Sequence, residues 1–157
     1  MAASLEDRLS LRELADRYAR AVDRRDWALA ATLFTAECVL QGPGYQLVGR
    51  EKILAGLRLI DRYSATQHSV HNQLVEVVGD LATGETYCTA HHVYARDGRQ
   101  RMLDWGIRYQ DRCVREAGAW RYARRELLLD WSQDLPLEQE SARDLAGAAQ
   151  ELSLEQE

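Results

Sequence analysis

The segment from Leu11 to Trp27, LRELADRYARAVDRRDW, decides the first half of the fold. Its apolar residues recur at the spacing of one helical face, and charged residues occupy the opposite side. This pattern predicts an amphipathic helix over about residues 6–22. Asp26 follows a break in the pattern and predicts the N-cap of a second helix, Trp27 to Phe34, because its carboxylate can accept free amide protons of the first turn.

Downstream of this helical hairpin, Gly42-Pro43-Gly44 predicts the turn of a short β-hairpin between Glu37–Leu40 and Tyr45–Val48. Residues Arg50 to Tyr63 return to the helical period and predict a third helix. From Thr66 the apolar period changes to two, which indicates long strands separated by turns that contain glycine and aspartate. The predicted strands are Thr66–Val78, Leu81–Ala95, Gln100–Arg115 and Ala119–Trp131.

Helices followed by a meander of long antiparallel strands predict an α+β fold, in which the helices cover one face of a curved sheet. A chain of 157 residues fits a single domain with one core. We expect this domain to span residues 1–135 and to leave a concavity between helices and sheet. Residues 136–157 are rich in acidic residues, alanine and glutamine, and they predict an acidic tail or a short helix.

The composition excludes several classes of function. Hydrophobic residues make up 46% of the chain, and no apolar run approaches the ~18–20 residues that a membrane span needs. The first residues lack the pattern of a signal peptide, so we expect a cytoplasmic protein. From Asp134 onward there are seven acidic residues and one basic residue, which leaves the body of the chain nearly neutral. A nucleic-acid surface is therefore not expected.

Metal and nucleophile chemistry is not indicated by the motifs. Cys38, Cys88 and Cys113 are an odd number at wide spacings, and we interpret them as buried apolar residues. His68 and His71 are three positions apart, a spacing that sends their rings to opposite faces of a strand. No cysteine cluster, zinc-binding helix motif or Gly-x-Ser-x-Gly motif accompanies them, so no metal site is expected.

Asp23 and His68 are the strongest candidates for chemistry. A histidine exchanges protons near neutral pH, and a carboxylate that holds one ring nitrogen leaves the other available as a base. Tyr18 belongs to the apolar helix face, so it can share a cavity with Asp23 only if the helix ends near Val22. A solvated turn aspartate and an exposed edge histidine are the alternative interpretations of the first two residues.

Strand alternation assigns the remaining candidates to faces. Asn72 shares the face of His68 on the first long strand. His91 and His92 point to opposite sides of the next strand, so at most one of them shares a cavity with His68, and a bulge would decide which. Two aromatic residues on one face of the third strand either line an apolar pocket or belong to the core: Trp105 and Tyr109.

Several motifs occur together along the chain. They are the helix end Arg-Tyr-Ala-x-Ala-Val-Asp-x-x-Asp-Trp, the segment Leu-Phe-Thr-x-Glu, Gly49-Arg50-Glu51, Ala-Thr-Gln-His68 followed by Asn72, and Gly118-x-Trp120-Arg121. Over about residues 7–131 the chain resembles the SnoaL-like branch of the nuclear-transport-factor-2-like superfamily. Its pattern is most similar to the dehydratase-type members: scytalone dehydratase, bile acid 7α-dehydratase and hexachlorocyclohexane dehydrochlorinase.

The resemblance implies a cone-shaped α+β barrel with a deep apolar pocket and an Asp-His dyad that needs no cofactor. Asp23 and His68 match the dyad of these enzymes. Tyr18 matches a tyrosine of the bile acid enzyme, and His91 falls where scytalone dehydratase has a second histidine. These four residues are the expected catalytic group.

Arg125 resembles an arginine near the end of the family's last strand. Alternation counted from Trp120 sends Arg124 inward instead, unless a bulge intervenes. The serine and asparagine with which scytalone dehydratase holds its substrate are absent around residues 104–108. The substrate of that enzyme is therefore not implied for this chain.

Together these residues predict a cofactor-independent lyase or isomerase. His68 would take a proton from a small, largely apolar substrate that is polyketide-, steroid- or aromatic-like, and dehydration is the expected reaction. Asn72, Trp105, Tyr109 and Arg125 would contact this substrate. A non-catalytic small-molecule-binding protein and the small subunit of a ring-hydroxylating dioxygenase are alternatives with the same fold. We expect a homodimer or homotrimer formed through the sheet.

Overall fold

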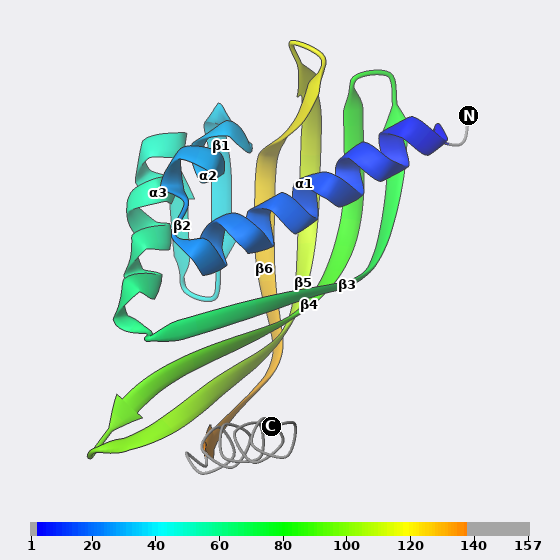
Figure 1. Ribbon diagram of the computed structural model, residues 1–157. Helices are drawn as coiled ribbons and strands as arrows, with labels where there is room; N and C mark the ends of the chain where they lie inside the picture. The colour runs from blue at the N-terminus through cyan, green and yellow to red at the C-terminus, as the bar shows by residue number, and fades with distance from the viewer. Residues whose placement is uncertain (1–2, 138–157) are drawn as a thin grey trace, which may run out of the picture.

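A computed structural model describes residues 3–137 of the chain (Figure 1). Its elements are α1 (Leu5–Arg24), α2 (Trp27–Thr32), β1 (Phe34–Gly42), β2 (Tyr45–Val48), α3 (Arg50–Leu57), η1 (Arg58–Arg62), β3 (Ala65–Val78), β4 (Leu81–Arg96), β5 (Arg99–Glu116) and β6 (Ala119–Pro136). The acidic tail expected over residues 136–157 lies, apart from its first two residues, outside the described part of the chain.

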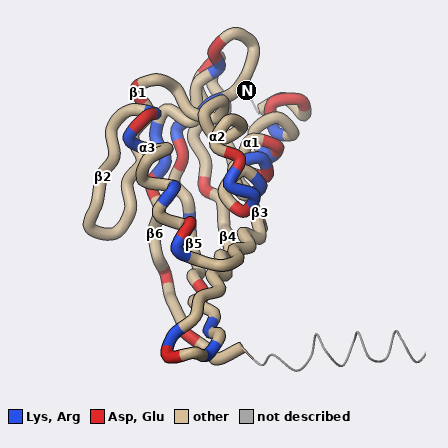
Figure 2. Tube along the Cα trace, turned by 60° about the vertical axis from the view of Figure 1, so that its left-hand side comes forward, with Lys and Arg blue, Asp and Glu red and all other residues tan. Residues whose placement is uncertain are grey.

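The first helix, α1, follows the amphipathic pattern of the sequence. It begins after Ser4, whose hydroxyl accepts the amide proton of Asp7 at 3.0 Å. The helix lies across one face of the sheet (Figure 1), and many of its residues are charged (Figure 2). Its buried side is apolar, as predicted, and consists of Leu11, Leu14, Ala15, Tyr18, Ala19, Ala21 and Val22. Within residues 3–137 no helix is long and apolar enough to cross a membrane.

The helices that follow are shorter than expected. Asp26 is the N-cap of α2, as predicted, and its carboxylate accepts the amide proton of Leu29 at 2.9 Å. This helix ends at Thr32 because Phe34 already pairs with Tyr122 of β6 as the first residue of β1. The predicted third helix divides into α3 and the tighter 3-10 turn η1.

The six strands form one open sheet in the order β2-β1-β6-β5-β4-β3. β1 pairs in parallel with β6, and every other neighbouring pair of the sheet is antiparallel. The edge strands β2 and β3 do not pair with each other, so the sheet curves around the helices without closing into a barrel (Figure 1). This arrangement confirms the α+β class with helices packed on a long curved sheet, and the sheet itself stays open.

Two of the bulges in the sheet decide the faces of the candidate site residues. On β3 the register with β4 shifts between Val70 and Gln73, and on β6 the register with β5 shifts between the partners of Arg112 and Cys113. The second shift leaves Ala123 without a partner on β5. An extra residue moves every later side chain of the strand to the other face, relative to strict alternation.

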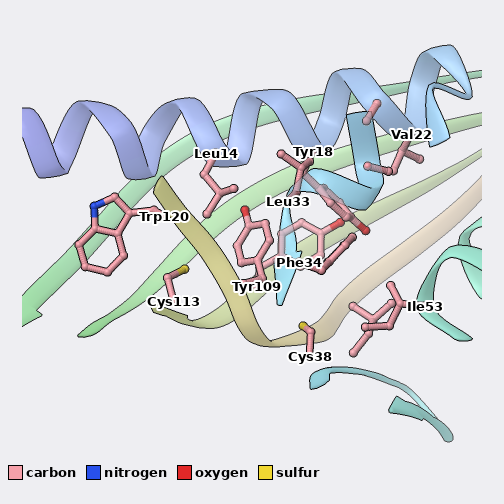
Figure 3. Packing of buried hydrophobic residues seen from close by; sticks show 14 of the residues in the cluster. Leu14, Tyr18, Val22, Leu33, Phe34, Cys38, Ile53, Tyr109, Cys113 and Trp120 are labelled. Atoms are coloured by element: carbon pink, nitrogen blue, oxygen red, sulfur yellow. The ribbon is translucent and has the colours of Figure 1, made fainter. Parts of the chain in front are cut away.

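The core lies between α1 and the inner face of the sheet (Figure 3). Tyr18 sits near its centre, with its ring edge-on to Phe34, Tyr109 and Tyr122 at centroid distances of 5.9 to 6.1 Å. All three cysteines are buried and free, as the sequence predicted. Burial raises the pKa of the Cys38 thiol to about 12, so it stays protonated and behaves as an apolar side chain.

Candidate functional site

The end of α1 places Asp23 against the beginning of β3. The helix stops because the backbone turns at Arg25, after which the amide of Asp26 donates back to the carbonyl of Ala21 at 2.9 Å. Asp23 is therefore in the last helical turn, and its side chain reaches the start of the long strand that carries His68.

Asp23 and His68 form a close hydrogen-bonded pair. The distance between Asp23 Oδ1 and His68 Nδ1 is 2.7 Å, and the backbone amide of His68 donates to Asp23 Oδ2 at 2.8 Å. The hydroxyl of Thr66 donates to Asp23 Oδ1 at 3.0 Å. The His68 side chain is 7% exposed and that of Asp23 is 20% exposed, so water competes little for these bonds.

The electrostatics of the pair favour an ionised carboxylate. Burial acts to raise the pKa of Asp23, but the hydrogen bonds from the His68 ring, the His68 amide and Thr66 outweigh it and hold this pKa below its ordinary value. A carboxylate can only accept hydrogen bonds, so the neutral imidazole of His68 carries its proton on Nδ1. Its Nε2 lone pair is then available to accept a proton.

His92, and not His91, shares the inner face of the sheet with His68. The ring centroids of His68 and His92 are 5.8 Å apart. His92 packs between Tyr63 and Trp105, each at a centroid distance of 4.8 Å, and its Nδ1 lies 3.1 Å from the carbonyl oxygen of Leu103. Burial lowers the pKa of His92 to about 4, so it is neutral at pH 7 and donates from Nδ1.

The prediction that His91 lies beside Asp23 and His68 is wrong, because His91 is on the other face of the sheet. On β4 the partner of Gln67 is His91, whereas the partner of His68 is Ala90, so His91 points to the outer face. There its Nδ1 lies 2.7 Å from Asp104 Oδ1. Counting faces on β4 alone could not choose between the two adjacent histidines, because the choice depends on cross-strand register with β3.

Asn72 also lies away from the dyad. The bulge after Val70 places Asn72 at an exposed position and turns Gln73 inward instead. Gln73 donates from Nε2 to the carbonyl of Leu11 at 3.3 Å and to Thr86 Oγ1 at 3.1 Å. The prediction that Asn72 faces the same cavity as His68 is therefore wrong, because one extra residue in β3 turns its side chain to the other face.

Arg125 points inward, because the bulge at Ala123 reverses the parity counted from Trp120. Its guanidinium donates from Nε and Nη2 to the two carboxylate oxygens of Asp111 at 2.8 and 2.9 Å. The neighbouring Arg124 is partly exposed and lies 3.6 Å from Glu126. The structure therefore decides the question between the two arginines in favour of Arg125.

Three tyrosine rings surround the buried guanidinium of Arg125. Its central carbon lies 3.9 Å from the ring centroid of Tyr109, 4.1 Å from that of Tyr122 and 4.3 Å from that of Tyr18. Arg125 Nη1 is buried and has no hydrogen-bond partner among the described residues. Burial raises the pKa of Tyr18 to about 12, so its hydroxyl remains protonated near neutral pH.

The space beside His68 is narrow. It is lined by the expected residues Tyr18, Tyr109 and Arg125 together with Val70 and Cys88, and it is too small for a water molecule. The deep pocket that the resemblance implied is thus largely filled by aromatic rings, among them Tyr18 and Tyr109 (Figure 3). The guanidinium of Arg125 fills the space next to these rings. Within residues 3–137, no group of three or more His, Cys, Asp or Glu side chains is arranged to hold a metal ion.

Comparison with known proteins identifies the family. A sequence model of the SnoaL-like domain matches residues 3–126. The chain belongs to the SnoaL-like family. An uncharacterised protein of Mycobacterium tuberculosis, Rv2910c, is 30% identical over 129 residues, which cover 78% of this chain and 85% of that protein.

Solved structures of this SnoaL-like fold are similar in shape. A putative scytalone dehydratase from Novosphingobium aromaticivorans has a TM-score of 0.75 at 21% identity, covering 85% of this chain and 91% of that one. A type 2 hexachlorocyclohexane dehydrochlorinase (LinA) has a TM-score of 0.74 at 19% identity, covering 86% and 91%. At these identities the likeness establishes the fold, which therefore occurs in proteins named as a dehydratase and a dehydrochlorinase.

Proposed function

We propose that this SnoaL-like protein is a cofactor-independent lyase or isomerase in which His68 is the general base. The observation that carries the proposal is the 2.7 Å hydrogen bond between Asp23 Oδ1 and His68 Nδ1. It orients the ring, stabilises the imidazolium that forms when Nε2 takes a proton, and leaves Nε2 free to do so. The dehydratase and dehydrochlorinase names of the structural relatives support an elimination reaction.

In the proposed reaction, His68 Nε2 removes a proton from a carbon next to an electron-withdrawing group. The electron pair of the broken C–H bond forms a double bond, and a hydroxyl group on the neighbouring carbon leaves with a proton as water. Tyr18 is a suitable donor because its hydroxyl is kept protonated by burial. Arg125 Nη1, a buried donor with no hydrogen-bond partner within residues 3–137, is suited to bind a carbonyl oxygen of the substrate.

The proposed substrate is small and largely apolar. The residues around His68 and His92 are mostly aromatic or aliphatic, including Trp105, Tyr109 and Val70. Because the space beside His68 does not admit water in this structure, binding requires the ring cluster around Arg125 to open. An apolar ligand would replace ring contacts with its own, whereas a highly charged ligand would lose its hydration without compensation.

One observation favours a second function, which is binding of a small molecule without catalysis. The interior beside the dyad is filled, so the hydrogen bond between Asp23 and His68 could serve to join α1 to β3. On this alternative, a bound ligand would lie away from His68 Nε2, and replacing His68 would leave ligand turnover unaffected.

Outer-face side chains support the further proposal of a homo-oligomer formed through the sheet. Leu74, Tyr87 and Trp131 are large hydrophobic residues that are 76%, 39% and 50% exposed in the single chain. They lie on strands β3, β4 and β6, on the side of the sheet away from α1. An exposed apolar face of this kind is typical of surfaces that associate.

The experiment uses a panel of β-hydroxy ketones on polyketide-like, steroid and aromatic frameworks. Dehydration is followed by the loss of one water in mass spectra and by the absorbance of the conjugated product. His68→Ala and Asp23→Asn should each reduce kcat by about 10²- to 10⁴-fold. His91→Ala is the matched control, because His91 has the same hydrogen bond to an aspartate on the opposite face. Equal turnover in all three variants would exclude the proposed reaction.

A further inference from the structure

Arg25 occupies a backbone position that normally suits glycine. It follows α1 with φ of 54° and ψ of 33°, in the left-handed region. Its amide donates to the carbonyl of Val22 at 3.2 Å, and the amide of Asp26 donates to that of Ala21 at 2.9 Å. This pair of bonds is the Schellman arrangement, in which the left-handed residue is usually glycine because a Cβ strains the backbone there. Contacts of the Arg25 side chain must offset that strain.

The guanidinium of Arg25 joins the three segments that position the dyad. Its Nη1 donates to the carbonyl of Asp23 and to Thr66 Oγ1, both at 2.8 Å. Its Nη2 donates to the carbonyls of Ile60 and Tyr63 at 3.2 and 3.1 Å. One side chain therefore connects the end of α1, the η1 turn and the first residues of β3.

The direction of these hydrogen bonds is fixed by chemistry. A guanidinium has donors and no acceptor, so Thr66 Oγ1 must accept from Arg25. The hydroxyl proton of Thr66 is then free to point to Asp23 Oδ1, 3.0 Å away. The same oxygen lies 2.7 Å from His68 Nδ1. The hydrogen bonds from Arg25 to Thr66, from Thr66 to Asp23 and from His68 to Asp23 therefore all run toward the carboxylate. The carboxylate must act as an ionised acceptor.

The charge of Arg25 also acts on the dyad. Its side chain is 24% exposed, and its Nε lies 3.6 Å from Asp61, which neutralises part of its charge on the solvent side. Through Thr66 the guanidinium lies within about 6 Å of the Asp23 carboxylate, given the two hydrogen bonds that connect them. A cation at this distance attracts the negative charge of the carboxylate. The other ionisable groups near the His68 ring are His92, which burial keeps neutral, and, on the side of the core, Tyr18, Cys88, Tyr109 and Arg125, the last paired with Asp111.

We propose that Arg25 is a positioning residue for the Asp23–His68 dyad, which acts through Thr66 to hold the Asp23 carboxylate as the acceptor of the Nδ1 proton of His68. The inference rests on the proposed function, because it assigns Arg25 a role in preparing the base. It is separate from simple fold stability, since the backbone turn itself would form as well or better with glycine.

The test uses two variants that separate charge from shape. Arg25→Gln keeps much of the side-chain length without the charge, and Arg25→Lys keeps the charge without the planar fork. The tautomer of the neutral His68 ring is read from the NMR chemical shifts of ¹³C,¹⁵N-labelled histidine, with His68→Ala used to assign the signals. The parent protein should show the Nδ1–H form that Asp23 holds, Arg25→Gln should show a mixture with the Nε2–H form, and Arg25→Lys, which keeps a charged donor, should lie between them.

The opposite result is equally clear. If Arg25 contributes only to the stability of the fold, the hydrogen bond between Asp23 and His68 survives its loss, and both variants keep the Nδ1–H form of the parent protein. An unchanged tautomer in Arg25→Gln therefore overturns the inference. Since the NMR signal needs no turnover, a failure of the substrate panel leaves this result readable. Where turnover is found, Arg25→Gln should reduce kcat about tenfold with less than a twofold change in KM.

Discussion

Arg125 and Asp111 form a buried ion pair whose contribution can be measured without any substrate. Their side chains are 1% and 6% exposed, and two hydrogen bonds of 2.8 and 2.9 Å join them. Replacing Asp111 with asparagine keeps the shape of the side chain and removes the negative charge. The guanidinium then stays buried without a counter-ion, a situation that typically costs about 3–5 kcal/mol.

The tyrosine rings around Arg125 determine where the loss of stability should lie within the range of about 3–5 kcal/mol. Three ring centroids lie within 4.3 Å of the guanidinium carbon, and each cation–π contact contributes about 0.5–2 kcal/mol. They continue to stabilise the cation in the variant, so we expect a loss near the lower limit, about 3 kcal/mol. For a chain of this size that loss corresponds to a decrease in Tm of roughly 6–12 °C.

The assay is urea unfolding followed by tryptophan fluorescence, with Asp130→Asn as the matched control. Asp130 forms the same two-point contact with Arg108, at 2.7 Å for both bonds, but these side chains are 36% and 33% exposed. The control should lose at most about 1 kcal/mol, because water replaces the lost partner. A loss below about 1 kcal/mol for Asp111→Asn, or equal losses for the two variants, would refute the reasoning.

Two further predictions concern buried groups. Burial lowers the pKa of His92 to about 4, whereas an unfolded chain titrates near ~6.5. The unfolded state therefore binds a proton first, so the contribution of His92 to the free energy of unfolding should be constant above about pH 6.5 and should fall by about 3 kcal/mol toward pH 4. Urea unfolding against pH measures this, and His92→Phe should remove that part of the slope; an unchanged slope would contradict the assignment. For the thiols, burial raises the pKa of Cys88 to about 11, and Cys38 and Cys113 are buried as well. A colorimetric disulfide reagent at pH 8 should modify none of them within minutes in the native state and all of them in urea, and rapid native labelling would show that the core opens.

Local features of the fold could be predicted because their causes are local. The cap at Asp26 depends on one carboxylate and the amides that directly follow it. The period of apolar residues in α1 and the turns between the long strands depend on neighbouring residues in the same way. The residue types mark Asp23 and His68 as candidates, and the resemblance implies that they form a pair. No local rule joins a helix end to a strand across about forty-five residues, so their hydrogen bond depends on the tertiary structure.

The faces of three candidate residues depend on register and differ from strict alternation or cannot be predicted by it. Asn72 lies beyond a bulge in β3, and the choice between His91 and His92 depends on how β4 pairs with β3. The inward direction of Arg125 depends on the bulge at Ala123. A bulge forms where a strongly curved sheet must adjust its twist, and that requirement comes from all of its strands at once.

By itself, the sequence determined the α+β class, the order of helices and strands, the cap at Asp26 and the burial of the three cysteines. These follow from periodicity and turn chemistry, which act over a few residues. Only the tertiary structure decided that the sheet stays open and that His92 and Arg125 face inward. It also decided that Arg25 connects to Asp23 through Thr66. The physical reason is that a strand's inward face is set by its register with its neighbours, and a single extra residue exchanges the two faces.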